Sequence, residues 1–359
     1  MPRMAALETW LDQLSLAILP ESAKAGRSLT PASADASFRR YFRLTLPDQR
    51  SFIVMDAPPE HENCAPFVKV AGLLADAGLN APKVIAQDLA QGFLLLTDLG
   101  PETYLQKILG NATSDAVMTS PDQLALSASE IDLLFRDAIS ALVTWQKSSR
   151  PGVLPPYDGA LLRREMDLFP EWYVSRHLGL TLDDTQKNEL ERTFSLLIAS
   201  ALDQPKVFVH RDYMPRNLMI ATDPSHNPGI LDFQDAVEGP LSYDVISLLK
   251  DAFISWDEER IIDWAVRYWE AARKSGLPVP EDFADFYQKL EWMGLQRHIK
   301  VIGIFCRLNY RDGKSHYLAD LPRHLNYARK VADRYNALRP FGRLLDTFDP
   351  QPVTIGYTF

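Results

Sequence analysis

Two carboxylates and an amide stand at chemically useful positions in the middle of the chain. Residues 207–212 read VFVHRD, so that a short apolar run leads to Asp212, and Asn217 follows five residues later. A second apolar run, GILDF at 229–233, carries Asp232. Carboxylate and amide oxygens are ligands that suit Mg²⁺, and a carboxylate can accept the proton of a hydroxyl group. The pattern predicts a site that positions an acceptor hydroxyl and holds Mg²⁺ against phosphate oxygens.

A second interpretation of the same residues is that Asp212 and Asn217 only cap turns, as Asp and Asn often do. Turn chemistry does not require Asp232 at the end of another apolar run, and this favours the chemical interpretation. His210 is expected to support the loop, because buried polar side chains are usually hydrogen-bonded. Asp244 is expected to be structural, as a helix cap or a support of the loop.

The elements that must position these residues change in character along the chain. Apolar residues at helical spacing predict a helix at 6–18. Two short runs joined by PDQR, at 37–46 and 51–58, predict a β-hairpin. With a helix at 65–77 and strands near 83–86 and 92–100, they predict a sheet of four or five strands.

The rest of the chain is mainly helical. Helices are expected at 131–147, 190–202, 241–273, 282–310 and 322–337. The fold class is therefore expected to be α+β, with a small antiparallel sheet lobe at 1–100 and a larger helical lobe at 101–359. The small, polar segment 110–130 is expected to be a loop or a lid.

The order and spacing of these segments resemble the protein-kinase-like fold, in its aminoglycoside/choline phosphotransferase branch. The resemblance implies two lobes, with nucleotide bound by the lobe at 1–100 and with the catalytic loop and the acceptor site in the lobe at 101–359. It also implies ATP and Mg²⁺ as cofactors and a catalytic role for Asp212 toward the acceptor hydroxyl. It implies that Asn217 and Asp232 bind the metal, and that Asp244 braces the catalytic loop. Gln234 stands where protein kinases have a glycine.

The nucleotide side departs from the family pattern. The segment at 32–44 lies where the family has its phosphate-covering hairpin, and its candidates for phosphate contact are Ser37, Phe38 and Arg39, with a solvated basic hairpin as the alternative. The strand SFIVMDAP lacks the family's lysine, so Arg43 or another hairpin arginine supplies the charge, or the phosphates rely on Mg²⁺ and amides. Backbone groups around Leu96 and Asp98 are candidates for the adenine edge, although an ordinary buried strand explains the same residues.

The amino-acid sequences of several segments are more similar to one group within this branch. ASFRRYFR, HRDYMPRNLM and FCRLNYRDGK resemble bacterial kinases that phosphorylate the anomeric hydroxyl of N-acetylmuramate or N-acetylglucosamine. The resemblance implies a sugar 1-phosphate product and a place in peptidoglycan recycling towards UDP-N-acetylmuramate. Candidate substrate residues are Glu165, Arg307 and Asp235, with core packing or a surface ion pair as the alternative. Another small acceptor, such as an aminoglycoside or choline, and a non-catalytic nucleotide-binding regulator remain open.

Composition excludes other classes of function. The chain has 359 residues, 46% hydrophobic and 24% charged, which is typical of a globular protein of two domains. A net charge of −9 disfavours nucleic acid as a partner. Two cysteines and the lack of a signal or membrane-spanning run lead us to expect a cytoplasmic protein, and we expect a monomer. No HExxH, CxxC or nucleophile-elbow pattern occurs, which disfavours a zinc enzyme or a hydrolase.

Overall fold

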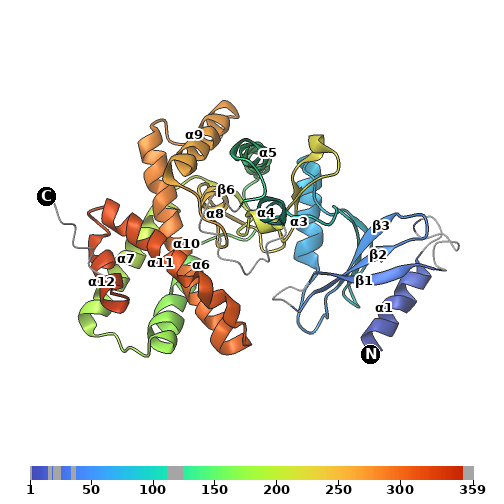
Figure 1. Cartoon of the computed structure of the whole chain (residues 1–359), viewed down its shortest axis with the longest axis horizontal. Coiled ribbons are helices and arrows are strands. Elements are labelled where there is room, and N and C mark those ends of the chain that lie inside the picture. Colours follow the sequence, from blue (N-terminus) through green and yellow to red (C-terminus); the bar gives the residue numbers. More distant parts are fainter. Residues whose placement is uncertain (1, 15–17, 19–25, 34–37, 111–123, 351–359) are drawn as a thin grey trace. The chain divides into compact units, whose positions relative to one another are not determined.

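The computed structural model describes residues 2–14, 18, 26–33, 38–110 and 124–350 and divides into two compact units (Figure 1). Unit 1 comprises Met1–Lys107 and Arg216–Ala236, and unit 2 comprises Ile108–Pro215 and Val237–Phe359. Helix α4 (Tyr104–Leu109) contains one of the points where the chain passes between them. The lobes expected from the sequence, 1–100 and 101–359, stay a prediction.

Unit 1 is built on a five-stranded antiparallel sheet with the strand order β1-β2-β3-β5-β4. The strands are β1 (Ser28–Ser33), β2 (Arg40–Thr45), β3 (Ser51–Asp56), β4 (Val84–Asp88) and β5 (Phe93–Thr97). The predicted hairpin is β2 with β3, in which Arg40 pairs with Asp56 and Thr45 with Ser51. Strand β1 was not predicted, because SLTPAS lacks apolar alternation, and its proline is tolerated at the edge of the sheet.

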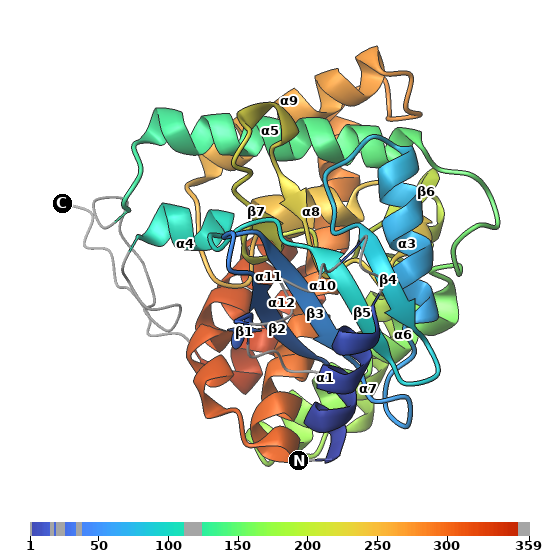
Figure 2. The ribbon, with the colours of Figure 1, turned by 90° about the vertical axis from the view of Figure 1, so that its right-hand side faces the viewer.

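Helix α1 (Pro2–Gln13) packs on one face of this sheet (Figure 2). Its Leu7, Trp10 and Leu11 form a buried cluster with alternate residues of the strands: Leu44, Val54, Phe93 and Leu95. This alternation follows from the period of two along a strand. The helix lies earlier in the chain than the 6–18 that the spacing predicts. Helix α3 (Ala65–Asp76) agrees with its prediction, and it ends before Gly78, whose φ is +74°.

A short second hairpin belongs to unit 1, although it follows much of unit 2 along the chain. It consists of β7 (Leu218–Met219) and β8 (Gly229–Ile230), with a 3₁₀ turn at Pro224–His226 between them. The N–H of Ile230 donates to the carbonyl oxygen of Asn80 at 2.7 Å. A Cβ on Gly229 would lie 2.9 Å from Cδ1 of Leu99, so a larger residue here would displace the end of that side chain.

Unit 2 is mainly helical and has one two-stranded sheet, β6 (Lys206–Val209) with β9 (Val237–Pro240). Its α-helices are α5 (Ala128–Lys147), α6 (Gly159–Met166), α7 (Asp184–Leu202), α8 (Tyr243–Leu249), α9 (Glu258–Lys274), α10 (Phe283–Asp312), α11 (Leu321–Arg334) and α12 (Arg339–Phe348). A π-helix spans Phe169–His177, and 3₁₀ turns span Pro215–Asn217 and Ser315–Asp320. The helix predicted at 241–273 is two helices, α8 and α9.

The core of unit 2 surrounds α10, which crosses the middle of the unit (Figure 1). Leu295, Ile299 and Ile302 of α10 join a large buried cluster with residues of α7, α11 and α12. Nearly every residue of α10 from Leu290 to Gly303 is buried, including charged ones. No helix in the part of the chain that the structure describes is long and apolar enough to cross a membrane.

Candidate active site

Strand β6 carries the predicted catalytic segment in unit 2. Its apolar residues are buried, and they lead directly into the residues 210–212. His210 is buried, and its Nδ1 accepts the N–H of Asp212 at 3.3 Å. This contact is the support that the sequence predicts for His210. Asp212 itself is half-buried, and its role toward substrate stays a prediction.

Asp244, near the start of α8, holds the backbone of this segment. Its Oδ2 accepts the N–H of His210 at 2.6 Å and its Oδ1 accepts the N–H of Arg211 at 2.9 Å. Burial raises the pKa of Asp244 to about 7, although the two N–H donors act in the opposite direction. Arg211 has a φ of +78°, a left-handed conformation that costs about 1–2 kcal/mol in a residue with a Cβ. The two hydrogen bonds therefore hold a strained turn.

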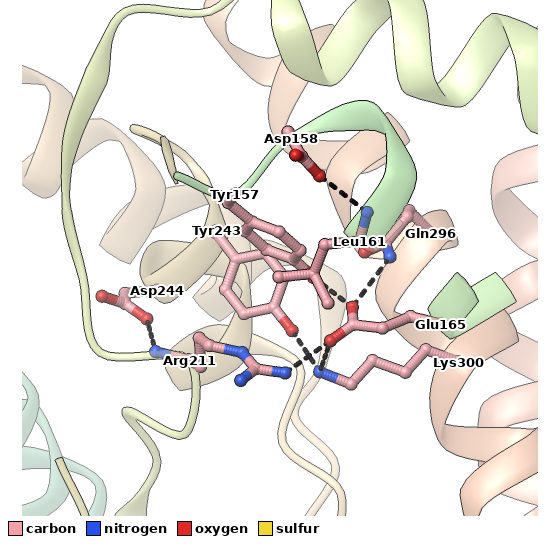
Figure 3. A network of polar contacts seen from close by, with 9 residues as sticks. All are labelled: Tyr157, Asp158, Leu161, Glu165, Arg211, Tyr243, Asp244, Gln296 and Lys300. Atoms are coloured by element: carbon pink, nitrogen blue, oxygen red, sulfur yellow. Dashed lines mark hydrogen bonds and ion pairs between the residues drawn. The ribbon is translucent and has the colours of Figure 1, made fainter. Parts of the chain in front are cut away.

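The side chain of Arg211 is held by Glu165 of α6 (Figure 3). Glu165 is 6% exposed, and its Oε1 accepts hydrogen bonds from Arg211 Nη2 at 2.5 Å and Lys300 Nζ at 3.0 Å. Its Oε2 accepts from the hydroxyl of Tyr157 and from Gln296 Nε2, the latter at 3.4 Å. Burial disfavours the ionised carboxylate, but Lys300 and Arg211 outweigh burial and lower the pKa of Glu165. The role of Glu165 toward substrate stays a prediction.

Aromatic rings close this network around the guanidinium group. The ring of Tyr157 lies 5.8 Å from the Arg211 guanidinium and 5.3 Å from the ring of Tyr243. The hydroxyl of Tyr243 accepts a hydrogen bond from Lys300 Nζ at 3.0 Å. A Cβ on Gly239 would lie 2.8 Å from the Cβ of Tyr157, so the close approach of β9 to this tyrosine requires glycine.

The second hairpin of unit 1 carries the other two residues of the motif. The N–H of Leu231 donates to the carbonyl oxygen of Asn217 at 2.9 Å, and Asn217 Nδ2 lies 3.5 Å from Asp232 Oδ2. Asp232 has a φ of +61°, and its Oδ1 accepts from Gln234 Nε2 at 2.9 Å. Phe233, the next residue, is buried and packs against Phe67 of α3, with 4.7 Å between ring centroids. The hairpin thus brings Asn217 and Asp232 together.

The chemistry of this pair fits a magnesium ion. Amide and carboxylate oxygens are the donors that Mg²⁺ takes from proteins, usually one or two of them with water and substrate phosphates completing the shell. Beside Asp232, the Oε1 atom of Gln234 is buried and has no hydrogen-bond partner in the described structure. Among the described residues, no three His, Cys, Asp or Glu side chains gather into a metal site. The metal role of Asn217 and Asp232 stays a prediction.

The candidates for phosphate contact lie in unit 1. Ser37 falls outside the described residues. The ring of Phe38, 63% exposed, stacks on His61 with 4.4 Å between centroids. Arg39 forms an ion pair with Glu62, with 3.0 Å between Nε and Oε2. Their roles toward nucleotide stay predictions.

Arg43 and Asp98, both candidates for the nucleotide site, bind each other. Arg43 Nε and Nη2 donate to the two carboxylate oxygens of Asp98 at 2.7 and 3.1 Å, and Nη2 also donates to the carbonyl oxygen of Gly100 at 2.9 Å. Burial opposes ionisation of Asp98, but the Arg43 contact outweighs it and lowers the pKa of Asp98. Leu96 is buried in β5. The pair therefore ties β2 to the chain that follows β5.

The strand that lacks the family's lysine has a different ion pair. Met55 is buried, and Asp56 at the end of β3 is fully buried. Asp56 accepts hydrogen bonds from Arg3 Nε at 2.7 Å and from Arg40 Nε at 3.0 Å. These contacts connect α1, β2 and β3 to one another, and arginines rather than a lysine make them.

The two remaining substrate candidates occupy different surroundings. Arg307, on α10 in unit 2, is half-buried, and its Nε has no hydrogen-bond partner in the described structure. Burial and the nearby Arg311 lower the pKa of Arg307. Asp235, in unit 1, is exposed and accepts a hydrogen bond from Gln234 Nε2 at 3.4 Å. Contact of either residue with substrate stays a prediction.

Three residues around Glu165 were missed by the sequence analysis: Tyr157, Gln296 and Lys300. Tyr157 precedes α6, whereas Gln296 and Lys300 lie one turn apart on α10, and only Lys300 leaves a signal in the sequence. Lys300 interrupts an apolar stretch of α10 whose residues from Ile299 to Gly303 are all buried. A lysine in such a stretch indicates a buried ionic partner, because an unpaired buried charge is costly.

Comparison with protein families gives a match over most of the chain. The model of the phosphotransferase enzyme family matches residues 28–286. An N-acetylmuramate/N-acetylglucosamine kinase of Pseudomonas aeruginosa is 50% identical over 351 residues, which are 96% of each chain. A protein of the same name from Neisseria meningitidis is 45% identical over 360 residues, which are 100% of each chain.

Solved structures give the same fold at low identity. An ethanolamine kinase of Plasmodium vivax has a TM-score of 0.60 at 12% identity and covers 91% of this chain and 87% of its own. The ternary complex of APH(2'')-IIa with streptomycin and ATP has a TM-score of 0.52 at 15% identity and covers 83% of this chain and 91% of its own. At these identities the likeness establishes the fold alone, which is the protein-kinase-like fold that the sequence predicts.

Proposed function

The chain belongs to the phosphotransferase enzyme family, and on that premise we propose that it transfers the γ-phosphoryl group of ATP to the anomeric hydroxyl of N-acetylmuramate or N-acetylglucosamine. The product is the sugar 1-phosphate, which serves peptidoglycan recycling towards UDP-N-acetylmuramate. The observation that carries this proposal is the 45–50% identity to kinases of that name, over 96% or more of this chain.

Asp212 is the proposed catalytic residue toward the sugar. Its carboxylate orients the anomeric hydroxyl and accepts its proton as the bond to phosphorus forms. The surroundings support this role, because the segment 210–212 is held by Asp244 through two backbone hydrogen bonds and by Glu165 through Arg211. A fixed carboxylate loses little freedom when it engages a hydroxyl, and positioning of this kind contributes much of the rate of phosphoryl transfer.

Asn217 and Asp232 are the proposed ligands of Mg²⁺. When bound, the ion neutralises charge on the transferred phosphoryl group and the leaving ADP. The left-handed turn at Asp232 and the buried Phe233 fix where this carboxylate points. ATP as the donor is supported by the family and by the ATP in a structural neighbour. Arg39 and Arg43, with Ser37 and Phe38, are the candidates to contact its phosphates.

The setting of the enzyme is proposed from the same sources. We expect a cytoplasmic monomer whose partners are small molecules, an amino sugar and ATP. Sedimentation velocity at micromolar concentration tests the monomer, with a single species near 40.6 kDa as the expected result.

Product analysis by ³¹P NMR tests the reaction. The protein is incubated with ATP and Mg²⁺ and, in parallel, N-acetylmuramate, N-acetylglucosamine, choline or an aminoglycoside. We expect an anomeric phosphate, with its coupling to the anomeric proton, from one or both amino sugars. Phosphate only on choline or the aminoglycoside, or on another hydroxyl of the sugar, would contradict the proposal. ATP binding without turnover of any acceptor would identify a nucleotide-binding regulator.

A further inference from the structure

Arg211 is attached to the body of unit 2 at both ends. Its backbone N–H donates to Asp244, and its guanidinium donates to Glu165 (Figure 3). The backbone of Arg211 itself is in the left-handed region, and the next residue along the chain is Asp212. A change in the position of the guanidinium is therefore passed through a single strained residue to the backbone of Asp212.

Glu165 is itself fixed by partners other than Arg211. Tyr157, Gln296 and Lys300 donate to its two oxygens, and they come from the segment before α6 and from α10. With Arg211 these make four donors, two on each oxygen, and fill the acceptor capacity of the carboxylate. Glu165 therefore has no oxygen left for a substrate hydroxyl while this network is intact.

The network is ionic and buried, which makes it stiff. Glu165 and Lys300 are almost completely buried, and both oxygens of Glu165 lie within 3.4 Å of their donors. Ion pairs in such surroundings interact more strongly than in water, and breaking one of them leaves an uncompensated charge.

From this geometry we infer that Glu165 is a positioning residue, which fixes the carboxylate of Asp212 by holding Arg211. The inference rests on the proposed function, because it assigns Asp212 as the group that acts on the sugar. It replaces a direct contact between Glu165 and the sugar with an indirect action through the backbone of 210–212.

Unit 2 offers a matched control in a second buried carboxylate. Glu291 of α10 is 2% exposed and interacts with Arg334, Lys250 and Tyr335, so an arginine, a lysine and a tyrosine meet a glutamate again. None of these partners adjoins 210–212 in the chain. Loss of Glu291 therefore reproduces the cost of breaking a buried ionic cluster without touching Arg211.

The test compares two double variants, Glu165→Gln/Lys300→Met and Glu291→Gln/Lys250→Met. Each double variant removes one acid and one base, so the net charge of each cluster is unchanged. The double variants should therefore lose less free energy of unfolding than single variants that leave a buried charge unpaired. We expect the Glu165 pair to lower kcat about 10- to 100-fold with both amino sugars, since small misplacements of reacting groups cost that much. KM for ATP and sugar should change less than about threefold, because binding groups are untouched. The control pair should keep kcat within about threefold of the wild type.

A double-mutant cycle in kcat sharpens the result. If Glu165 acts only through Arg211, then Arg211→Met and Glu165→Gln/Arg211→Met have the same kcat. The inference would be overturned if the kcat losses of the Glu165 and Arg211 substitutions multiplied, or if the Glu291/Lys250 control pair lost as much kcat as the Glu165/Lys300 pair. It would also be overturned if the Glu165/Lys300 pair changed only KM, or lost activity only with N-acetylmuramate. Wild-type turnover is measured first, because its absence with both sugars refutes the proposed function. The same kcat ratios are then measured with whichever acceptor is phosphorylated, or with water as the acceptor, through ADP release.

Discussion

Two buried glutamates of unit 2 bind partners of the same residue types, but these partners belong to different parts of the chain. Glu165 binds Arg211, Lys300 and Tyr157, whereas Glu291 binds Arg334, Lys250 and Tyr335. Arg334 is the last residue of α11, so the second cluster joins one helix to another. Arg211 belongs to a strained turn beside Asp212, so the first cluster joins a helix to the proposed catalytic segment. We infer that the same chemistry stabilises the fold in one place and, in the other, orients the residue that we propose to be catalytic.

This difference shows why burial and pairing alone do not identify a functional residue. Both carboxylates are desolvated and ion-paired, and removal of either one leaves cations without their partner. What separates them is the segment to which the cation belongs. The following predictions test that separation, from the largest expected effect to the smallest.

The substitution Asp212→Asn should cause the largest loss of kcat among the variants compared. The amide keeps the size of the side chain but cannot accept the proton, so kcat should fall about 10²- to 10⁴-fold, the usual contribution of a general base. The half-buried position should leave the urea midpoint near that of the wild type. Steady-state kinetics with either amino sugar measures the loss. A loss below tenfold would mean that another group takes the proton.

The substitution Glu291→Gln should lower stability but not kcat. It leaves Lys250 and Arg334 without their carboxylate, and the free energy of unfolding should fall by about 3 kcal/mol, the low end for buried pairs because Arg334 is partly exposed. Urea denaturation measures the change, and kcat below the unfolding transition is the control. If kcat falls more than tenfold in folded protein, the two clusters do not differ in the way proposed.

The substitution Gly239→Ala tests the contact of Tyr157 with Glu165. The added Cβ would lie 2.8 Å from Tyr157 and must displace it, at a cost of about 1–3 kcal/mol in stability for such overpacking. We expect a several-fold loss of kcat as well. Gly342→Ala, whose Cβ would lie 3.2 Å from Ala332, is the control and should leave kcat unchanged. Equal kcat values for the two variants would mean that the contact of Tyr157 with Glu165 does not affect the position of Asp212.

The pH dependence of stability tests the brace at Asp244. Burial raises its pKa to about 7 in the folded protein, whereas an aspartate in an unfolded chain has a pKa of about 3.9. Between these values the folded protein retains a proton that the unfolded chain has released, so the stability contributed by this group falls as pH rises from about 4 to about 7. Arg297 and Asp212 act on the same carboxylate in opposite directions.

The control for this effect is Asp244→Asn, which cannot titrate. The difference in unfolding free energy between wild type and Asp244→Asn should shrink as pH rises from 5 to 7. Urea denaturation at several pH values measures this difference. A difference that grows with pH would mean that the N–H donors lower the pKa of Asp244 below its ordinary value.

Sequence patterns predicted the parts of the fold that depend on local order. The hairpin of β2 and β3, the helix α3 and the apolar strand β6 follow from residues close together in the chain. The segments that carry Asn217 and Asp232 are also near neighbours in sequence, and their two short strands pair. Strand β1 was missed because an edge strand needs little apolar character.

The network around Glu165 could not be predicted, because its members come from distant segments. The partners Tyr157, Arg211, Gln296 and Lys300 meet only once α6, β6 and α10 have packed. The apolar neighbours of Lys300 indicate that this lysine is buried, but nothing in the sequence shows which residue pairs with it. The sequence therefore makes Glu165 a substrate candidate, whereas in the structure four donors of the protein occupy its two carboxylate oxygens.

The most direct test of the difference between the two clusters is the ratio of kcat values for the two charge-matched double variants, measured side by side with a saturating amino sugar and ATP. We predict that Glu165→Gln/Lys300→Met turns over at least about tenfold more slowly than Glu291→Gln/Lys250→Met, since only the former disturbs the residue beside Asp212. Equal kcat values in two folded proteins would contradict the account.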